Sequence, residues 1–173
     1  MDVQILSGES LKLKIKKIIL VVSPSLSIPK TEADTVLSFE QNAEISKVAN
    51  YRLLINGAGE YEVGGLKISS VKLGNSLVFS FGLENLEITL FKASSLSEVT
   101  SDKIKNYDIV IFNADLEINQ SVLTAMEPRV IVLYGQKSKE AAKELGMASL
   151  TSTSKVSFSE EKLPEETEIY LLS

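Results

Sequence analysis

Side chains able to carry acid, base or metal chemistry are restricted in this sequence to oxygen donors and amines. Its 173 residues include no histidine and no cysteine. No side chain therefore has an ordinary pKa between about 5 and 8, and no thiolate can serve as a nucleophile. A general base at neutral pH would have to be a glutamate, an aspartate or a lysine whose pKa is strongly shifted by its surroundings.

Serine offers another route to nucleophilic catalysis. The Ser-x-x-Lys spacing of serine–lysine enzymes occurs three times, beginning at Ser69, Ser152 and Ser159. A chain with this many serines and lysines contains such spacings by chance, and two of the three fall in segments with the pattern of a loop or a strand. We therefore predict no catalytic residue from these spacings.

A glycine-rich segment runs from residue 55 to residue 65 and reads INGAGEYEVGG. Gly57 and Gly59 could belong to a phosphate cradle, but such a cradle needs a helix directly after the loop, and Leu66 begins the pattern of a strand. Glycines that permit turns or bulges are the better interpretation. Glu60 and Tyr61 should then point to opposite faces of a strand, with Tyr61 partly buried and its hydroxyl hydrogen-bonded.

The elements that position these residues begin with closely spaced strands. Leu11, Leu13 and Ile15 alternate with lysines, which is the period of a half-buried strand whose lysine side faces water. A tight hairpin turn is predicted at residues 73–76, where glycine and asparagine tolerate positive φ. Further strands are predicted at residues 17–22, 35–38, 51–55, 66–72, 76–81, 86–91, 107–112 and 130–134.

Two helices are predicted in the second half of the chain. The first covers residues 120–126, where Asn119 is placed to cap the N-terminus. The second covers residues 138–145, with Ser138 as its cap and Gly146 at the position of a left-handed C-terminal residue. Strands that alternate with helices indicate a layered α/β fold, and without a convincing linker we expect one domain over residues 1–173.

Composition and charge limit the partners. A formal net charge of −5 argues against nucleic acid, because phosphate binding depends on clustered lysine and arginine. The apolar run at residues 18–22 is too short for the core of a secretory signal, and no stretch reaches the roughly 18 apolar residues of a membrane-spanning helix. We therefore expect a cytoplasmic protein that binds neither nucleic acid nor a membrane.

Several segments resemble, in order, small single-domain bacterial hydrolases of the metallo-β-lactamase superfamily. The best matches are residues 59–62 (GEYE), residues 127–132 (EPRVIV) and the tail from Leu163, and residues 33–37 (ADTVL) resemble the strand before that family's metal-binding loop. The resemblance implies a reduced αββα sandwich of two mixed sheets packed face to face. Its expected core consists of Leu53, Ile55, Ile68, Val78, Ile88, Leu90, Ile109, Ile111, Ile131 and Leu133.

Enzymes of that family hold zinc mainly through histidines, and the resemblance puts other residues at those positions. In the family's His-x-His-x-Asp-His loop, Glu40 and Asn42 take the places of the first two histidines. Glu44 and Ile45 take the places of the aspartate and the final histidine. The later ligand positions fall near residues without a donor side chain: Leu90, Ala93 and Gly135.

Two functions follow from this resemblance. The first is a catalytically inactive homologue, or pseudoenzyme, with no zinc and no other cofactor, which has a structural or protein-binding role in a homo-oligomer or beside a protein partner. The alternative is a hydrolase with an altered, oxygen-ligated site, in which Glu40, Asn42 and Glu44 bind Mg²⁺, Mn²⁺ or Ca²⁺. Three ligands from one loop would bind weakly, since calcium takes about six to eight oxygens.

Overall fold

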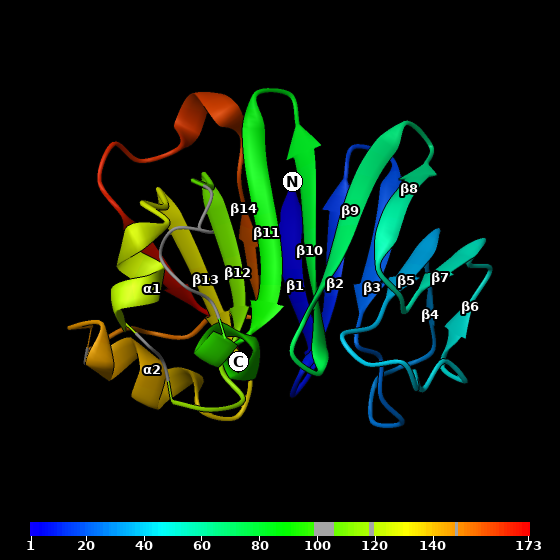
Figure 1. Cartoon of the computed structure of the whole chain (residues 1–173), viewed down its shortest axis with the longest axis horizontal. Helices are drawn as coiled ribbons and strands as arrows, with labels where there is room; N and C mark the ends of the chain where they lie inside the picture. Colours follow the sequence, from blue (N-terminus) through cyan, green and yellow to red (C-terminus); the bar gives the residue numbers. More distant parts are fainter. Residues whose placement is uncertain (99–105, 118–119, 148) are drawn as a thin grey trace.

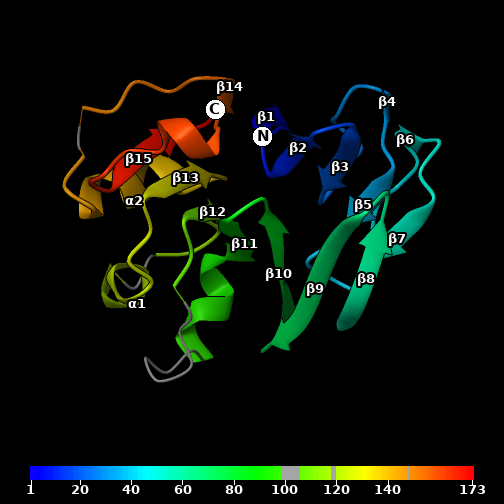
Figure 2. The same cartoon turned by 90° about the horizontal axis from the view of Figure 1, so that it is seen from above.

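The computed structural model describes residues 1–98, 106–117, 120–147 and 149–173 of the chain. Two mixed sheets pack face to face, as the view from above shows most plainly (Figures 1 and 2). The predicted α/β sandwich of mixed sheets is therefore confirmed.

The first sheet has six strands among the described residues. It begins as an antiparallel meander at the N-terminus, continues with parallel strands, and gains a strand from the C-terminal part of the chain at its other edge. In spatial order its strands are β14 (Lys155–Ser157), β1 (Asp2–Ser7), β2 (Ser10–Ile15), β3 (Ile18–Val22), β5 (Thr35–Leu37) and β7 (Leu53–Ile55).

The second sheet has seven strands within the same described ranges. Its first four strands along the chain, β8 to β11, pair antiparallel through hairpins, and the later strands add in parallel. In spatial order the strands are β15 (Glu168–Leu171), β13 (Val130–Tyr134), β12 (Ile109–Asn113), β11 (Leu86–Lys92), β10 (Ser76–Leu83), β9 (Leu66–Leu73) and β8 (Gly59–Val63).

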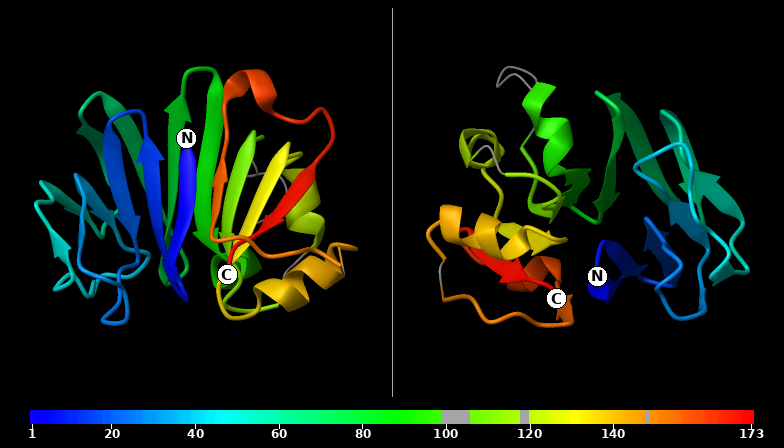
Figure 3. Two further views of the ribbon diagram at one scale, coloured as in Figure 1. Left: turned by 180° about the vertical axis from the view of Figure 1, so that it is seen from behind. Right: turned by 90° about the horizontal axis from the view of Figure 1, so that it is seen from below.

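Smaller elements cover the outer faces of the two sheets (Figures 2 and 3). Helices α1 (Gln120–Ala125) and α2 (Ser138–Glu144) pack on the seven-stranded sheet, where Leu123 and Ala141 join Phe112 in an apolar cluster. The outer face of the six-stranded sheet is covered by the two-stranded β4 (Thr31–Glu32) and β6 (Val48–Ala49) and their loops. The described residues also form the 3-10 helices η1 (Ala93–Glu98) and η3 (Glu160–Lys162).

Apolar side chains fill the space between the sheets. In β2, Leu11 and Leu13 are fully buried whereas Lys14 is exposed, as the period-two pattern predicts. Every residue of β12 and β13 is buried, because these strands carry apolar clusters on both faces. Eight of the ten predicted core residues are buried.

The two remaining predicted core residues, Leu53 and Val78, are only partly buried. Leu53 lies on β7, which forms one edge of its sheet. Val78 points to the outer face, because the alternation along β10 turns its neighbours Phe79 and Phe81 inward.

The predicted cap of the second helix is wrong. Ser138 is the first residue of α2 and is buried, and the capping position belongs to Lys137, which makes no side-chain hydrogen bond to the helix. The predicted cap Asn119 lies outside the described residues. Within the described residues, no helix combines the length and the apolar character needed to cross a bilayer.

The glycine-containing turns behave as the sequence predicts. Gly74 has a φ of +57° in the turn between β9 and β10, and Leu73 pairs with Ser76 across it. The strand β9 follows the glycine-rich segment directly, so no helix opens there. Tyr61 is partly buried, and its hydroxyl donates a hydrogen bond of 3.0 Å to the carbonyl oxygen of Gly57. Both the partial burial and the hydrogen bond of this hydroxyl were predicted.

Candidate functional site

The candidate site lies where the carboxyl ends of strands from both sheets meet. Lys92 is the last residue of β11 and Asn113 the last of β12, and Glu40 follows β5 by three residues. In α/β sheets, ligands bind beyond the carboxyl ends of the parallel strands, because the loops there can present side chains without disturbing the core. The side chains gathered at this edge are therefore the ones to consider for function.

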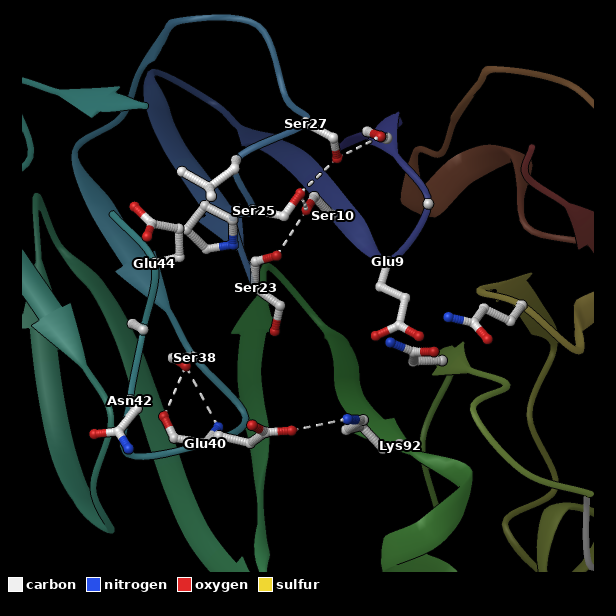
Figure 4. A pocket seen from close by; sticks show the side chains of 17 residues that line it. Glu9, Ser10, Ser23, Ser25, Ser27, Ser38, Glu40, Asn42, Glu44 and Lys92 are labelled. Carbon is white, nitrogen blue, oxygen red and sulfur yellow. Dashed lines mark hydrogen bonds and ion pairs between the residues drawn. The ribbon is translucent and has the colours of Figure 1, made fainter. Parts of the chain in front are cut away.

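An ammonium group held between two carboxylates forms the centre of the site. The Nζ atom of Lys92 lies 3.1 Å from Oε1 of Glu40 and 3.6 Å from Oδ2 of Asp115 (Figure 4 shows the Glu40 contact). The Lys92 side chain is only 14% exposed, whereas that of Glu40 is 65% exposed. The cation is thus fixed at the wall of the protein, and one of its anionic partners reaches solvent.

The surroundings of Lys92 keep it protonated. Burial lowers the pKa of Lys92, but the hydrogen bond that Lys92 donates to Glu40 and the negative charges of Asp115, Glu40 and Glu9 together raise it above its ordinary value. Asp115 is itself anchored, since it accepts hydrogen bonds from the backbone N–H of Ser94 at 3.0 Å and from its hydroxyl at 2.7 Å. The ammonium therefore acts as a fixed positive charge at neutral pH.

A cavity of about 630 Å³ opens beside this ammonium (Figure 4). Its charged lining consists of Lys92 and three glutamates: Glu9, Glu40 and Glu44. Figure 4 shows the side chain of Glu9 directed into the cavity on the same side as Lys92. A second cavity, of about 660 Å³, shares Glu40 and Lys92 and continues toward Gly57 and Lys72. The ion pair thus lies at the boundary of two cavities.

Serine hydroxyls line the wall of the first cavity opposite Lys92. The hydroxyls of Ser7 and Ser27 lie 3.0 Å apart and those of Ser25 and Ser27 2.9 Å apart. Ser10 donates to the carbonyl oxygen of Ser23 at 2.7 Å and approaches the Ser25 hydroxyl at 3.3 Å. These linked hydroxyls can each donate or accept, so the wall is suited to hydroxyl-bearing molecules.

A buried amide lies at the base of the same cavity. Asn113 lines the cavity and is 0% exposed, yet neither its Nδ2 nor its Oδ1 has a hydrogen-bond partner among the described residues. The buried hydroxyl of Tyr134 likewise makes no bond of hydrogen-bond geometry there, although the Asn113 side chain lies near enough to interact with it, and burial strongly raises the pKa of this tyrosine, which stays neutral. Unpartnered buried polar atoms are costly and call for an explanation.

Gly135 explains how this amide is accommodated. Its φ of +97° is a conformation that favours glycine, and a Cβ atom placed there would overlap Oδ1 of Asn113. The resemblance put a metal ligand near this position. Here the Asn113 amide occupies the space that a side chain at residue 135 would need.

The predicted loop residues come to this cavity but do not converge. Glu40 is engaged by Lys92, and Oε1 of Glu44 accepts a hydrogen bond of 2.9 Å from the Ser46 backbone N–H, which lowers the pKa of Glu44. Figure 4 shows Asn42 and Glu44 lying apart from each other and from Lys92. The described part of the chain contains no group of three acidic side chains that could hold a metal ion. Because the sequence also lacks histidine and cysteine, the residues present do not fit a zinc ion.

Sequence reasoning missed the residues that form the centre of the site. Lys92 lies between the predicted ligand positions at residues 90 and 93, and no pattern pointed to it. Asp115, Asn113 and Glu9 were also missed, since each becomes significant only through contacts with distant segments. Of the predicted structural motif, Gly57 lines the second cavity, whereas Gly59 and Glu60 are exposed on β8.

Comparison with solved structures identifies the fold. No protein-family model matches the chain, and no curated protein matches its sequence. A candidate Zn-dependent hydrolase of the metallo-β-lactamase superfamily from Thermotoga maritima is 20% identical, covers 99% of this chain and 98% of its own, and gives a TM-score of 0.77. The metallo-β-lactamase fold protein YhfI from Bacillus subtilis gives 0.59 at 8% identity, over 98% of this chain and 95% of its own.

An isothiocyanate hydrolase from Delia radicum gut bacteria is 11% identical over 92% of this chain and 100% of its own, with a TM-score of 0.56. The prediction that the chain is not an enzyme is contradicted, because the structures that share its fold include named hydrolases. The strand order and these likenesses together show that the chain has the metallo-β-lactamase fold.

Proposed function

We propose that this protein is a hydrolase in which the Lys92 ammonium supplies the fixed positive charge of the active site. The observation that carries the proposal is the position of this ammonium: it is 14% exposed, held by Glu40 and Asp115, and placed where two cavities meet. A preorganised charge in a shielded site stabilises developing negative charge better than the same charge in water does.

The chemistry assigns separate roles to the two partners of the ion pair. A lysine ammonium has three N–H donors, and its two carboxylate partners leave at least one free to face a substrate carbonyl oxygen. The exposed Glu40 carboxylate can accept a proton from a water molecule that attacks the carbonyl carbon. The oxyanion that forms is stabilised by Lys92, and the proton passes from Glu40 to the leaving group.

Lys92 is not assigned the role of base or nucleophile. Those roles need a neutral amine at the working pH, and the carboxylates around Lys92 raise its pKa instead of lowering it. The predicted alternative, an oxygen-ligated ion at Glu40, Asn42 and Glu44, gains no support from the geometry, since Glu40 is paired with Lys92 and Glu44 with a backbone N–H.

The test is hydrolysis of an uncharged chromogenic ester, p-nitrophenyl acetate, in buffer that contains EDTA. We expect multiple turnovers by the wild-type protein and a loss of about 10²–10³-fold in kcat for Lys92→Met, the usual effect of removing one oxyanion-stabilising group. Lys67→Met is the matched control, because Lys67 is an exposed lysine of β9 that lines neither cavity.

Three results would count against the proposal. They are no turnover above the buffer rate, loss of turnover in EDTA, and equal rates for Lys92→Met and Lys67→Met. Turnover beyond one equivalent of product also separates catalysis from simple acylation of surface lysines.

The predicted partners and location stay predictions. A homo-oligomer or a protein partner is tested by the solution mass of the purified protein, for which a monomer with no captured protein would be the contrary result. Cytoplasmic location and the expectation that the protein binds neither nucleic acid nor a membrane rest on sequence composition alone.

A further inference from the structure

We infer that the cavity of about 630 Å³ beside Lys92 binds a small organic cation that carries a primary ammonium group and several hydroxyls, as amino sugars and amino alcohols do. The inference rests on the proposed function, because it names the substrate class of that same site. A cavity of this volume is in the range that holds a small organic molecule.

Charge gives the first argument. The charged lining of the cavity holds three carboxylates and one ammonium, which leaves a formal excess of negative charge. Lys92 is already balanced by Glu40 and Asp115, so it does not cancel the charge of the other cavity glutamates. An anionic ligand would be repelled from this lining, and a cation would be attracted.

Glu9 is the carboxylate placed to receive that cation. It follows Gly8 in the turn between β1 and β2, is half-buried, and points into the cavity (Figure 4). Its charge reaches both Lys92 and Tyr134, since it helps to raise the pKa of each. Among the described residues it has neither a hydrogen-bond nor an ion-pair partner, in contrast to Glu40 and Glu44. A ligand ammonium would supply the missing partner.

The buried amide of Asn113 gives an independent argument. Neither its donor nor its acceptor makes a bond of hydrogen-bond geometry with a described residue, although the residue is fully buried, lines this cavity and has the Tyr134 hydroxyl nearby. A buried polar group without a partner calls for one, and a ligand in the cavity that Asn113 lines can supply it. An amide offers one acceptor and two donors, which matches the hydroxyl group of a ligand.

The serine wall completes the match to a hydroxyl-rich molecule. Ser25 and Ser27 lie across the cavity from Lys92 (Figure 4), and the Ser7 hydroxyl, 3.0 Å from that of Ser27, extends the connected row. Each hydroxyl can reverse its donor and acceptor roles, so the row can adapt to ligand hydroxyls without a change in side-chain position. A purely apolar amine would leave this wall unused.

The experiment measures binding by calorimetry, with glucosamine, glucose and glucose 6-phosphate as probes, at about pH 6.5, where the amine is protonated. The three share a hydroxyl-rich ring and differ in charge. We expect glucosamine to bind at least about tenfold more tightly than glucose, and glucose 6-phosphate to show no binding. Glucose 6-phosphate binding as tightly as glucosamine, or no difference between glucosamine and glucose, would overturn the inference.

Three variants assign the effect to residues. Glu9→Gln should lower glucosamine affinity about tenfold and leave glucose unchanged, because it removes the charge and keeps the shape. Asn113→Leu should weaken both sugars. The control Thr35→Val removes another fully buried polar atom without a partner, on β5 and outside the cavity lining, and should change neither. Equal effects of Asn113→Leu and Thr35→Val on sugar affinity, or an unchanged glucosamine affinity in Glu9→Gln, would contradict the assigned roles.

These experiments can refute the ligand inference and the proposed function independently of each other. Lys92→Met should abolish ester hydrolysis but keep or strengthen glucosamine binding, since it removes a positive charge from the cavity lining. Glucosamine binding in a protein without hydrolytic turnover would refute the proposed function alone. Turnover in a protein with no preference for the cationic sugar would refute the ligand inference alone.

Discussion

The buried amide of Asn113 leads to a prediction that runs against the usual effect of a core substitution: Asn113→Leu should make the protein more stable. Asn113 is 0% exposed, and both polar atoms of its side chain lack a hydrogen-bond partner among the described residues. Each unsatisfied buried donor or acceptor costs about 1–3 kcal/mol. Leucine has the same number of side-chain heavy atoms and no polar atom, so it removes this cost without leaving a cavity, although its methyl groups are bulkier than the amide.

Close packing beside Gly135 limits the gain, because a tetrahedral branched carbon must fit where the flat amide now lies. Counting one unsatisfied atom as the net relief, we expect the free energy of unfolding to rise by about 1–3 kcal/mol. For a chain of this size that corresponds to an increase in Tm of about 2–12 °C. Urea unfolding followed by circular dichroism measures the free energy, and calorimetry measures Tm.

Two comparisons make this prediction decisive. Thr35→Val removes a similar unpartnered buried atom elsewhere and should also stabilise, whereas Asn113→Ala leaves a cavity and should destabilise. If Asn113→Leu lowers the free energy of unfolding by more than about 1 kcal/mol while Thr35→Val raises it, the Asn113 amide is satisfied in the folded protein and the reasoning is refuted.

Three further predictions concern the surroundings of this amide. The folded-state pKa of Lys92 is raised, so its contribution to stability is complete below the unfolded value of 10.5 and is lost as the pH rises through the folded value. Above about pH 10, the free energy of unfolding measured with urea should therefore fall more steeply with pH in the wild type than in Lys92→Met. Parallel pH dependences of the two proteins would contradict the shift. Gly135→Ala should lower the free energy of unfolding by about 1–3 kcal/mol, because residue 135 has a φ of +97° and the new Cβ would overlap the Asn113 side chain. An unchanged Tm would contradict this prediction and show that the loop relaxes. Mn²⁺ or Mg²⁺ at millimolar concentration should not raise Tm, whereas a rise abolished by Glu40→Ala would support the oxygen-ligated alternative.

Local sequence patterns predicted much of the fold because most of its elements are locally consistent. The continuous apolar runs of β12 and β13 have only one stable location, between two layers, and both strands are found there. The prediction that Val78 belongs to the core fails because an apolar residue near the start of a strand does not by itself show which face of the strand is inward. In β10 the side chains of Phe79 and Phe81 occupy the inward face. The prediction that Ser138 caps α2 fails because Ser138 is buried as the first residue of the helix, so its preference for the capping position does not decide its place.

The centre of the site could not be predicted in the same way. Lys92 has no sequence signature, and its significance comes from Glu40, which precedes it by 52 residues, and from Asp115, which belongs to another strand end. The resemblance directed attention to ligand positions instead, and from their chemistry the prediction of a non-enzyme followed. A functional site carried by a shared fold need not share the motif of other proteins with that fold.

In the proposed reaction the Lys92 ammonium would stabilise the oxyanion, as a metal ion does in metal-dependent hydrolases. Both are positive and both can stabilise an oxyanion, but only a metal also lowers the pKa of a bound water to about 7. A lysine-centred site must therefore obtain its hydroxide-like nucleophile from a carboxylate base, and Glu40 is the carboxylate that both touches Lys92 and reaches solvent. Glu40→Gln should then lower kcat for p-nitrophenyl acetate without weakening substrate binding, whereas Lys92→Met should lower kcat in a way that added hydroxylamine, a strong nucleophile, does not rescue. Rescue of Glu40→Gln but not of Lys92→Met by hydroxylamine assigns water activation to the first residue and oxyanion stabilisation to the second; the reverse pattern is incompatible with a fixed ammonium at Lys92.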